Sequence, residues 1–489
     1  MILPCGRTLQ LLKSRLPIHG SGFQRNNFVT LRKIFDEKAS RPEDYDCILS
    51  WDATGYKKKL KFDKKSGRLI GFGCDPERFT MHHMFSNCVN CFMVTSPELK
   101  MKSIQYPVAY YHCSSLNSKD IRRQFEEVLT GLDSVGLRVV STVCDTASEH
   151  VRFFNHTLDT SATADPDIKV RLGDFWSISD PPHLIKKFRN NWISSGEHDR
   201  HTRRLDKDGR LITWKIMKAV YTVSTTGVDG QKRPLTLLRK FTWDVVSPVS
   251  IQRLRVSLAA IPFSKQVRDF VSDNLDRLAQ VSGLRVDDVL CTLEFMGMVD
   301  ELFQIMNSKV PFTWTEDDDG TGTPIGLRDK CDTTCGRTLT YFSELYGVSI
   351  QYLMNITGLT TPESIPQPDT VLIIDRLQRL STVSAYFTQW KDYVDQTPNL
   401  TKTQKSKMFL THWLYNDLQK TCHSMIEIMN KYVKNSDRVW VPRRFNQDPV
   451  ESLFGQLRNN AGSNTNMDRT AVDIGMTQYR AKKTLHLPK

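Results

Sequence analysis

The sequence predicts an α/β domain with a mixed sheet, joined to a large and mostly helical region. Short apolar or alternating runs recur between residues 46 and 180, and amphipathic helical patterns lie among them, which predicts the sheet and its flanking helices. Long amphipathic runs fill most of residues 190–408, which predicts the helical region. The length of 489 residues exceeds what one core usually holds, so we expect two or three domains.

The strands begin with DCILSW, a short apolar run that ends at Asp52. YKKKLKFDKKSGRLIGFG alternates, turns around Gly67 and alternates again, which is typical of a hairpin. SIQYPVAYYHC predicts another strand, and KDIRRQFEEVLTGLDSVG predicts an amphipathic helix that stops at Gly136. LRVVSTVCD predicts a buried strand that ends at Asp145. DFWSISDPPHLIKKFRNNW predicts a strand that ends near Asp180, followed by a turn and a basic helix.

The domain organisation follows from these runs. RTLQLLKSRL places three leucines on one helical face, which indicates either a docking helix or a small DNA-binding or dimerising unit. The predicted divisions are an N-terminal helical and basic segment, the first part of an α/β domain, a helical inserted domain, and a C-terminal return to the α/β domain: 1–45, 46–189, 190–408 and 409–489.

The composition favours a reduced protein with a polyanionic partner. The net charge of +13 fits a nucleic-acid partner, although a solvated basic surface gives the same composition. The 11 cysteines are scattered, which indicates reduced thiols in the cytosol or nucleus. MHHMFSNCVNC offers His82, His83, Cys88 and Cys91, but no second Cys-x-x-Cys pair follows at zinc-finger spacing. No stretch approaches the roughly 18 to 20 apolar residues of a membrane span.

Glu451, in RRFNQDPVESLFGQLRNNAGSNTN, has two interpretations. Local physics predicts that Asp448 caps a helix, that Pro449 is its first residue, and that Glu451 closes a capping box at the third position. The other interpretation is a metal ligand. Asp52 and Asp145 at strand ends and Glu451 on a helix would supply oxygen ligands for two divalent metal ions, as phosphoryl transfer between nucleic-acid strands requires. Spacing alone does not choose between the two.

Six segments in order resemble the P-element-type transposases and their THAP-domain-containing, transposon-derived relatives, over about residues 4 to 468. They are LPCGRTLQLLKSRL, SWDATGYKKKLKFDKKSGRLIGFG, STVCDTASEHVRFF, SDPPHLIKKFRNNW, LRVSLAAIPFSKQV and RFNQDPVESLFGQLRNNAGSNTN. The resemblance implies an RNase H-like fold interrupted by a GTP-binding-type domain, which suits residues 190–408. It also implies an Asp-Asp-Glu active site that binds Mg²⁺ or Mn²⁺, carried over to Asp52, Asp145 and Glu451.

In that family GTP is a structural cofactor for assembly on DNA. Asp448 matches a residue near the nucleotide and its metal, and the guanine-reading segment Phe-Asp-x-x-Asn matches Phe303, Gln304 and Asn307. Gln304 stands where an aspartate would accept two hydrogen bonds from guanine, so we expect guanine selectivity to be weakened. The family's zinc-coordinating finger would precede the first matched segment, and its long C-terminal domain would follow the last.

The expected function is that of a nuclear DNA transposase that acts on transposon ends and target DNA as a homo-oligomer, a dimer or a tetramer, without a membrane. The basic runs Lys57-Lys58-Lys59, Lys64-Lys65 and Lys186-Lys187 would contact phosphates or form a solvated face. The alternative is a domesticated or truncated copy that binds DNA or protein without transposing. A third hypothesis is a nucleotide-binding regulator built on the inserted domain.

Overall fold

The computed structural model divides the chain into two compact units. The first comprises Met1–Asp180 and Arg444–Lys489, and the second comprises Pro181–Arg443. The sequence-based boundaries lie at 189/190 and 408/409, so the observed second unit begins earlier and ends later than the predicted insertion. The structure describes residues 21–63, 67–71, 85–101, 104–114, 116–145, 171–172, 175–196, 202–226, 238–309, 373–433, 436, 438–460 and 467–484.

The first unit is built on the predicted mixed sheet, whose strand order is β5-β4-β1-β6-β8-β7. β1 pairs antiparallel with β4 and parallel with β6, and β6 pairs parallel with β8. A separate hairpin, β2 with β3, occupies the predicted hairpin region. The strands are β1 (Asp46–Gly55), β2 (Lys61–Asp63), β3 (Arg68–Ile70), β4 (Cys88–Thr95), β5 (Gln105–Cys113), β6 (Arg138–Cys144), β7 (Arg171–Leu172) and β8 (Phe175–Ser179).

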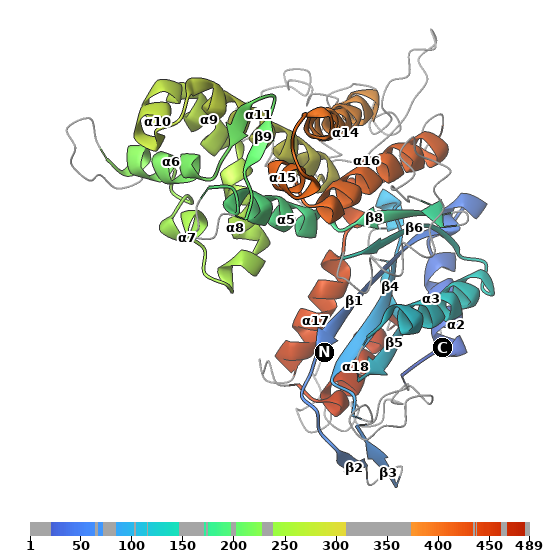
Figure 1. Ribbon diagram of the computed structural model, residues 1–489. Helices are drawn as coiled ribbons and strands as arrows, with labels where there is room; N and C mark the ends of the chain where they lie inside the picture. The colour runs from blue at the N-terminus through green and yellow to red at the C-terminus, as the bar shows by residue number, and fades with distance from the viewer. Residues whose placement is uncertain are drawn as a thin grey trace, which may run out of the picture. The chain divides into compact units, whose positions relative to one another are not determined.

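Helices cover both faces of this sheet (Figure 1). Alternate side chains of a strand point to opposite sides, and the strands here carry buried apolar side chains on both sides, so each face packs against helices. One face packs against α2 and α3 through side chains such as Phe28, Trp51 and Phe125. The other face packs against α17 and α18 through Cys91, Leu453 and neighbouring apolar residues. The helical elements of this unit are α2 (Arg25–Asp36), η1 (Pro42–Tyr45), η2 (Leu99–Met101), α3 (Ser118–Asp133), α17 (Asp448–Asn460) and α18 (Arg469–Thr484).

Helix α2 belongs to the core of the first unit. Phe28, Leu31 and Phe35 of α2 are fully buried in the same cluster as strands β1 and β4. The sequence placed a division at 45/46, whereas this packing joins residues 25–36 to the sheet. The leucine-rich segment RTLQLLKSRL lies outside the described residues.

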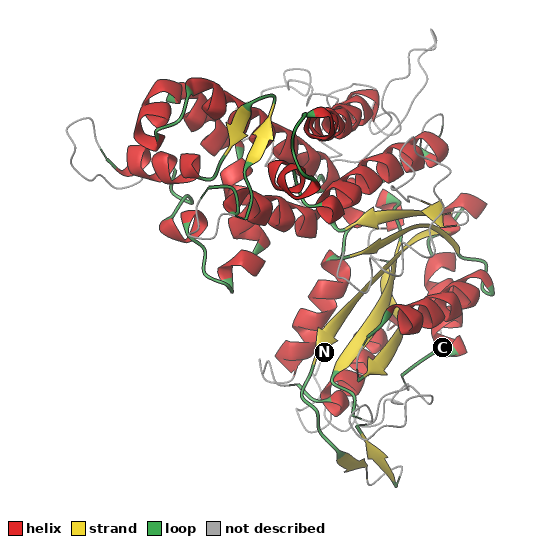
Figure 2. Cartoon of the chain, viewed as in Figure 1, coloured by secondary structure: helices red, strands yellow, loops and turns green. Residues whose placement is uncertain are grey.

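The second unit is mostly helical, as the red ribbon of Figure 2 shows. Its buried aromatic rings pack around Phe295, which contacts Phe188, Trp192 and Trp390. The sequence missed its hairpin, which turns at Asp208 and Gly209, both with positive φ. The elements are α5 (Pro181–Ile193), β9 (Leu205–Lys207), β10 (Arg210–Ile212), α6 (Lys215–Thr225), α7 (Trp243–Val246), η3 (Gln252–Leu254), α8 (Val256–Ala260), η4 (Ile261–Phe263), α9 (Lys265–Asp273), α10 (Leu275–Ser282), α11 (Val286–Met306), α14 (Ile373–Gln396), α15 (Lys402–Met408) and α16 (His412–Tyr432). The short helix η6 (Pro442–Arg444) precedes α17 in the chain.

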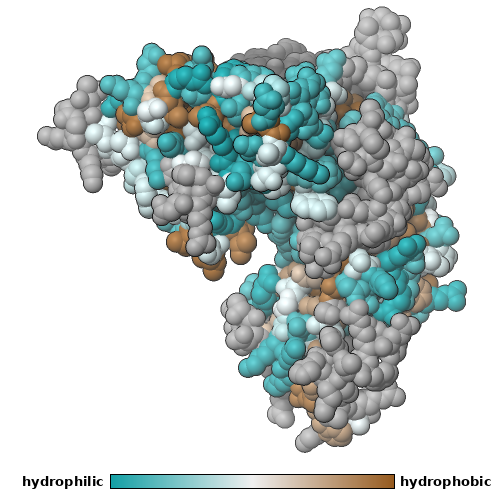
Figure 3. All heavy atoms as spheres, in the orientation of Figure 1, coloured by the Kyte–Doolittle hydropathy of each residue, from teal (hydrophilic) through white to brown (hydrophobic). Residues whose placement is uncertain are grey.

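Among the described residues on the face that Figure 3 shows, most are hydrophilic, and the apolar ones form separate patches. No helix in the described part of the chain has the length and apolar character needed to cross a membrane.

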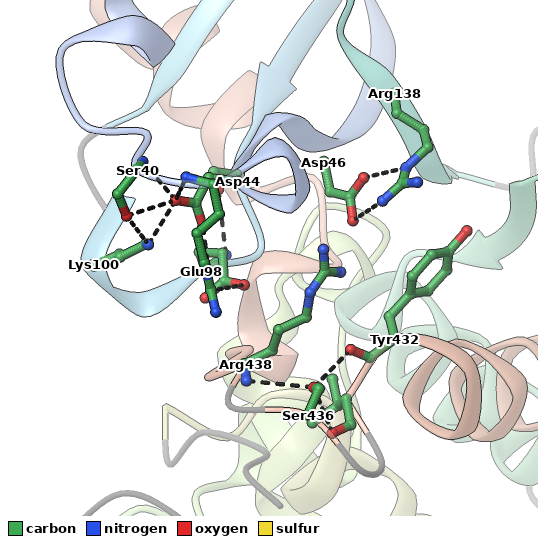
Figure 4. A network of polar contacts seen from close by, with 12 residues as sticks. Ser40, Asp44, Asp46, Glu98, Lys100, Arg138, Tyr432, Ser436 and Arg438 are labelled. Carbon is green, nitrogen blue, oxygen red and sulfur yellow. Dashed lines mark hydrogen bonds and ion pairs between the residues drawn. The ribbon is translucent and has the colours of Figure 1, made fainter.

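Ion pairs fix the start of β1 (Figure 4). Arg138 at the start of β6 donates two hydrogen bonds to Asp46, at 2.5 and 2.9 Å, and so sets the parallel register of the two strands. The buried Asp44 accepts hydrogen bonds from the Ser40 backbone at 2.8 Å and from Lys100 at 2.7 Å. Burial would raise the pKa of Asp44, but the Lys100 and Ser40 hydrogen bonds lower it to about 2. The carboxylate therefore stays ionised and ties η1 to the β4–β5 connection.

A buried histidine links the end of β1 to α18. His112 on β5 lies 2.8 Å from the Tyr56 hydroxyl through Nδ1 and 2.9 Å from Asp473 through Nε2. Tyr110 donates to the same Asp473 carboxylate at 3.0 Å, and Arg469 lies 3.8 Å from its other oxygen. Burial lowers the pKa of His112 even though Asp473 acts in the opposite direction.

Acidification is therefore expected to destabilise the protein through His112. The folded state keeps this side chain neutral, whereas the unfolded chain takes up a proton near its ordinary pKa of about 6.5. This contribution to stability is complete above about pH 6.5 and is lost as the pH falls toward the lower folded-state pKa. Thermal unfolding between about pH 5 and 8 measures it.

His112→Gln should flatten that pH profile, and the exposed His412→Gln in the second unit is the matched control. Burial also lowers the pKa of His423, so part of the acid sensitivity should remain in the His112 variant. An unchanged pH slope in His112→Gln would refute the assignment.

Candidate active site

Three aspartates lie in register on the neighbouring parallel strands β1, β6 and β8. Asp145 and Asp180 directly follow β6 and β8, whereas Asp52 lies within β1, which continues to Gly55 and does not end at Asp52 as the sequence predicted. Trp51 pairs with Cys144 and Cys144 pairs with Ser179, so Asp52, Asp145 and Asp180 each come directly after a residue in one row. The backbone N–H of Asp180 donates to the Cys144 carbonyl at 3.0 Å, which continues the row by one residue. Because adjacent strands lie about 4.8 Å apart, the topology brings the predicted Asp52 and Asp145 to adjacent positions.

Asp52 lies on the face of the sheet that α17 covers. Trp51 is buried in the core beneath α3, so the alternation of the strand places the next residue on the opposite side. Asp52 is half-buried, and one carboxylate oxygen accepts a hydrogen bond from the Ala53 N–H at 2.7 Å. In Figure 1, α17 runs alongside β1 on this face.

Helix α17 does not begin as the sequence predicted. The Gln447 carbonyl accepts hydrogen bonds from the N–H groups of Val450 and Glu451, at 2.9 and 3.0 Å, so Gln447 is the N-cap. Asp448 is the first helical residue, and its N–H donates to the Asn446 side chain at 3.1 Å. The predicted cap at Asp448 and the capping box at Glu451 are wrong, because Asn446 accepts the first N–H and the helix starts one residue earlier. Pro still falls within the first turn, where it costs no helical hydrogen bond.

Two side chains, one from the N-cap of α17 and one from the helix itself, hold the Glu451 side of the helix against β1. Gln447 donates from Nε2 to the Trp51 carbonyl at 2.6 Å, and Arg458 lies 3.4 Å from the Thr54 hydroxyl. Glu451 lies between Gln447 and Arg458 along the helix. In the same way, Asp52 lies between their partners, Trp51 and Thr54, along β1. The helix rises roughly 16 Å between the two contacts and the strand about 10 Å, a difference that the long arginine side chain spans.

At successive 100° steps, Gln447, Glu451 and Arg458 fall within about 40° of one another on α17. Glu451 therefore lies on the helix edge next to β1, although its side chain is exposed. The structure thus places Asp52 and Asp145 on adjacent strands and carries Glu451 on α17 along β1, on the face of the sheet where Asp52 lies. Which of them binds a metal stays a prediction.

The donor chemistry of this edge fits Mg²⁺ or Mn²⁺, since carboxylate oxygens are the ligands these ions prefer. Within the described ranges, however, no three His, Cys, Asp or Glu side chains gather closely enough to hold a metal ion. The fit therefore rests on residue type and topology, with the side chains spread along the edge.

The two cysteines of the Cys/His motif lie in a strand. Cys88 and Cys91 belong to β4, where Cys91 is fully buried and the Cys88 thiol lies 3.4 Å from the Cys113 carbonyl. Burial raises the pKa of Cys91 to about 12, which disfavours the thiolate that zinc requires. The two histidines of the motif, His82 and His83, lie outside the described residues.

The basic runs were expected either to contact DNA phosphates or to form a solvated face, and their lysines differ in the structure. Lys59 forms an ion pair with Asp468 at 3.5 Å, and Lys187 forms one with Asp417 at 3.0 Å. Each of these lysines therefore has an acidic partner within its own unit. The exposed Lys58 stays a candidate for phosphate contact, and the Lys64-Lys65 pair lies outside the described residues.

The second unit contains a pocket of about 220 Å³ at the predicted base-reading segment. Phe303 and Gln304 line it together with Lys240 and Asp300. Asp300 pairs with Arg268 at 2.5 Å and accepts a hydrogen bond from Gln304 at 3.2 Å.

Asn307 is the C-cap of α11 and is not among the described residues that line this pocket, and Asp448 belongs to the first unit. The structure therefore does not place these two predicted nucleotide-binding residues in the pocket.

The ring of Phe303, the amine of Lys240 and the amide of Gln304 are groups that suit a nucleotide. The Gln304 amide does not reproduce the two-acceptor carboxylate that guanine selectivity needs.

Three residues near the strand ends were not identified from the sequence as functional: Asp180, Gln447 and Arg458. Asp180 had a recognisable signal, because it is the third acidic residue to end a predicted parallel strand. Arg458 follows Glu451 by two helical turns, a spacing that places both on one face. Gln447 had no such signal, since its role depends on the partner strand.

Comparisons with known proteins support the architecture. Residues 19–157 match the family of the TNP-like, RNase H N-terminal domain. The transposable element P transposase of Drosophila melanogaster is 24% identical over 216 residues, which are 43% of this chain and 25% of that protein. The aligned region thus spans about a quarter of that relative's length.

Among solved structures, the chain is similar to the Drosophila P element transposase strand transfer complex, with a TM-score of 0.60 and 17% identity. That match covers 99% of this chain and 86% of the other. The predicted RNase H-like fold with a large helical region is confirmed.

Proposed function

Because this chain has the fold of the P element transposase and carries a P element transposase-like RNase H domain, we propose that it is a DNA transposase core that cuts and joins DNA strands. The observation that carries the proposal is the position of Asp52 and Asp145 on adjacent parallel strands, with α17, the helix of Glu451, held along β1 by Gln447 and Arg458. The net charge of +13 suits a DNA partner, and the similar solved structure is a strand transfer complex. Work on chromosomal DNA would place the protein in the nucleus.

The carboxylates of Asp52, Asp145 and Glu451 would hold two divalent ions, Mg²⁺ or Mn²⁺. When bound, such ions lower the pKa of an attacking water or 3′-hydroxyl and stabilise the leaving oxygen. Asp52 and Asp145, on adjacent rigid strands, would keep their carboxylates at a fixed spacing. Arg458 sits beside the same edge and would neutralise a DNA phosphate next to the scissile bond.

Strand cutting by the purified chain tests this proposal. DNA that carries the chain's own genomic flanks would be incubated with Mg²⁺ or Mn²⁺, with and without nucleotide. Metal-dependent cutting is the expected result. Protein that binds this DNA as a dimer or tetramer but leaves it uncut in both metals would instead be a domesticated DNA-binding module.

We also propose that the pocket of the second unit binds a purine nucleotide with little preference for guanine. Phe303 offers a ring for stacking, and Lys240 offers a cation for phosphate. GTP would be held as a structural cofactor, and ATP would compete with it, because Gln304 presents one acceptor where a carboxylate would present two.

Gln304→Asp is expected to raise the preference for GTP over ATP by about tenfold, since a charged acceptor strengthens the hydrogen bonds to the guanine edge. Binding of fluorescent GTP and ATP analogues measures this ratio. Gln280→Asp, an exposed site on α10, is the matched control. Equal ratios in wild type and Gln304→Asp would remove residue 304 from base recognition.

A further inference from the structure

We propose that Gln447 and Asp180 are positioning residues for Glu451: together they clamp the first turn of α17 against the strand ends that carry Asp52 and Asp145. This inference rests on the proposed function for its catalytic meaning. The clamp itself consists of hydrogen bonds within the first unit.

The clamp has two side-chain contacts, both buried. The carboxylate of Asp180 accepts a hydrogen bond from the backbone N–H of Gln447 at 2.8 Å, and Asp180 is 1% exposed. The side-chain amide of Gln447 donates to the Trp51 carbonyl at 2.6 Å, and Gln447 is fully buried. A buried charge-assisted hydrogen bond of this kind holds backbone more firmly than an exposed one.

Gln447 and Asp180 together thus join three strands to one helix. Through Trp51 the clamp reaches β1 next to Asp52, and through the Asp180 backbone it reaches Cys144 next to Asp145. The Gln447 carbonyl then accepts the N–H of Glu451 at 3.0 Å. The clamp therefore contacts Glu451 itself and, for Asp52 and Asp145, the residue directly before each of them in the chain.

The chemistry of residue 447 is specific to an amide. A carboxylate of the same length would face the Trp51 carbonyl oxygen, which would repel it. An apolar side chain of similar length, such as methionine, would fill the space without donating. The amide orientation follows from the same contact, because the reverse orientation would place two oxygens together.

The clamp is tested first without reference to activity, by hydrogen exchange of the intact chain. Gln447→Met should speed amide exchange about tenfold across residues 450–454 and leave the strands of the sheet unchanged. Gln456→Met, at an exposed position of the same helix, is the matched control and should change neither. Exchange that is unchanged, or faster over the whole first unit, would overturn the clamp.

The catalytic consequence is tested by the metal dependence of strand cutting. Gln447→Met should raise the Mn²⁺ concentration for half-maximal cutting by about tenfold, with DNA affinity unchanged. Loss of a residue that orients a metal ligand commonly weakens metal binding by this amount. Asp180→Asn keeps an acceptor for the Gln447 N–H and should retain most activity, whereas Asp180→Ala should behave like Gln447→Met. A purely structural role would lower the melting temperature of these variants and leave the Mn²⁺ dependence of the folded protein unchanged.

The two proposals fail in different ways. If the wild type does not cut DNA but the exchange result holds, the clamp stands and the transposase activity falls. If the wild type cuts and the Mn²⁺ dependence of Gln447→Met and Asp180→Ala is normal, the activity stands and the positioning role is overturned. Asp180→Ala replaces Gln447→Met in the exchange experiment if the latter fails to fold.

Discussion

Glu451→Gln is expected to reduce metal-dependent strand cutting by about a thousandfold, with DNA binding and melting temperature close to wild type. The amide keeps the shape of the side chain but loses the negative charge that binds a divalent ion, and metal ions contribute several kcal/mol of transition-state stabilisation. Because the side chain of Glu451 is exposed, we expect the substitution to change the stability of the fold by about 0.5 kcal/mol or less. Cutting of labelled DNA in Mn²⁺ and Mg²⁺ measures the effect.

Glu126→Gln supplies the matched control. Glu126 is an exposed carboxylate on α3, the helix that covers the opposite face of the same sheet, and it pairs only with its helix neighbour Arg122 among the contacts that the structure describes. This variant should cut DNA at the wild-type rate. Comparable cutting by Glu451→Gln would show that this glutamate is not a metal ligand and would return Glu451 to a structural role.

Phe125→Ala is expected to destabilise the first unit by about 3–5 kcal/mol, the usual cost of removing a buried aromatic side chain. Phe125 of α3 is 1% exposed, and its ring packs edge-on against Trp51, with centroids 4.9 Å apart. A second ring, Phe175 of β8, lies 5.9 Å away. The cavity left by alanine would be lined by side chains of β1 and β8, the strands that lead to Asp52 and Asp180.

Thermal unfolding should register this change as a fall of roughly 10 °C in the transition of the first unit. Phe62→Ala is the control, because Phe62 lies in the hairpin strand β2 and is 57% exposed. A Phe125 variant as stable as the Phe62 variant would mean that α3 contributes little to the sheet's stability.

Periodicity predicted most of the first unit because each strand and helix buries one regular face. Strands β1 and β6 and helix α3 appear where the patterns placed them, although β1 continues past Asp52 to Gly55 and α3 ends at Asp133, three residues before the predicted stop at Gly136. Strand β4 was missed because its cysteines attracted a metal interpretation, although its alternate side chains Val89, Cys91 and Met93 face one core. A cysteine in such a strand behaves as a small apolar side chain.

The sequence predicted which residue types form the candidate site, but it did not predict the hydrogen bonds that position them. The ends of predicted strands offered Asp52 and Asp145 as candidates, and the resemblance selected them. Their pairing follows from strand order, which the resemblance supplied. Helix α17 starts one residue early because Asn446 and Gln447 form contacts to the sheet and to the next turn, and no local pattern encodes a contact 396 residues distant in the chain. Long-range hydrogen bonds of that kind can be found only once the fold is known.

Because residues 181–443 interrupt the first unit, its two parts are synthesised at different times. The ribosome completes strands β1 to β8 before it makes roughly 260 further residues, which at about 5–20 residues per second takes tens of seconds. Until then the apolar side chains of β4 and β5 that α17 and α18 will cover, among them Met93 and Tyr110, have no partner helices. The nascent sheet must therefore persist half-covered, and newly made chains of this protein should depend on chaperones more than their finished stability would suggest.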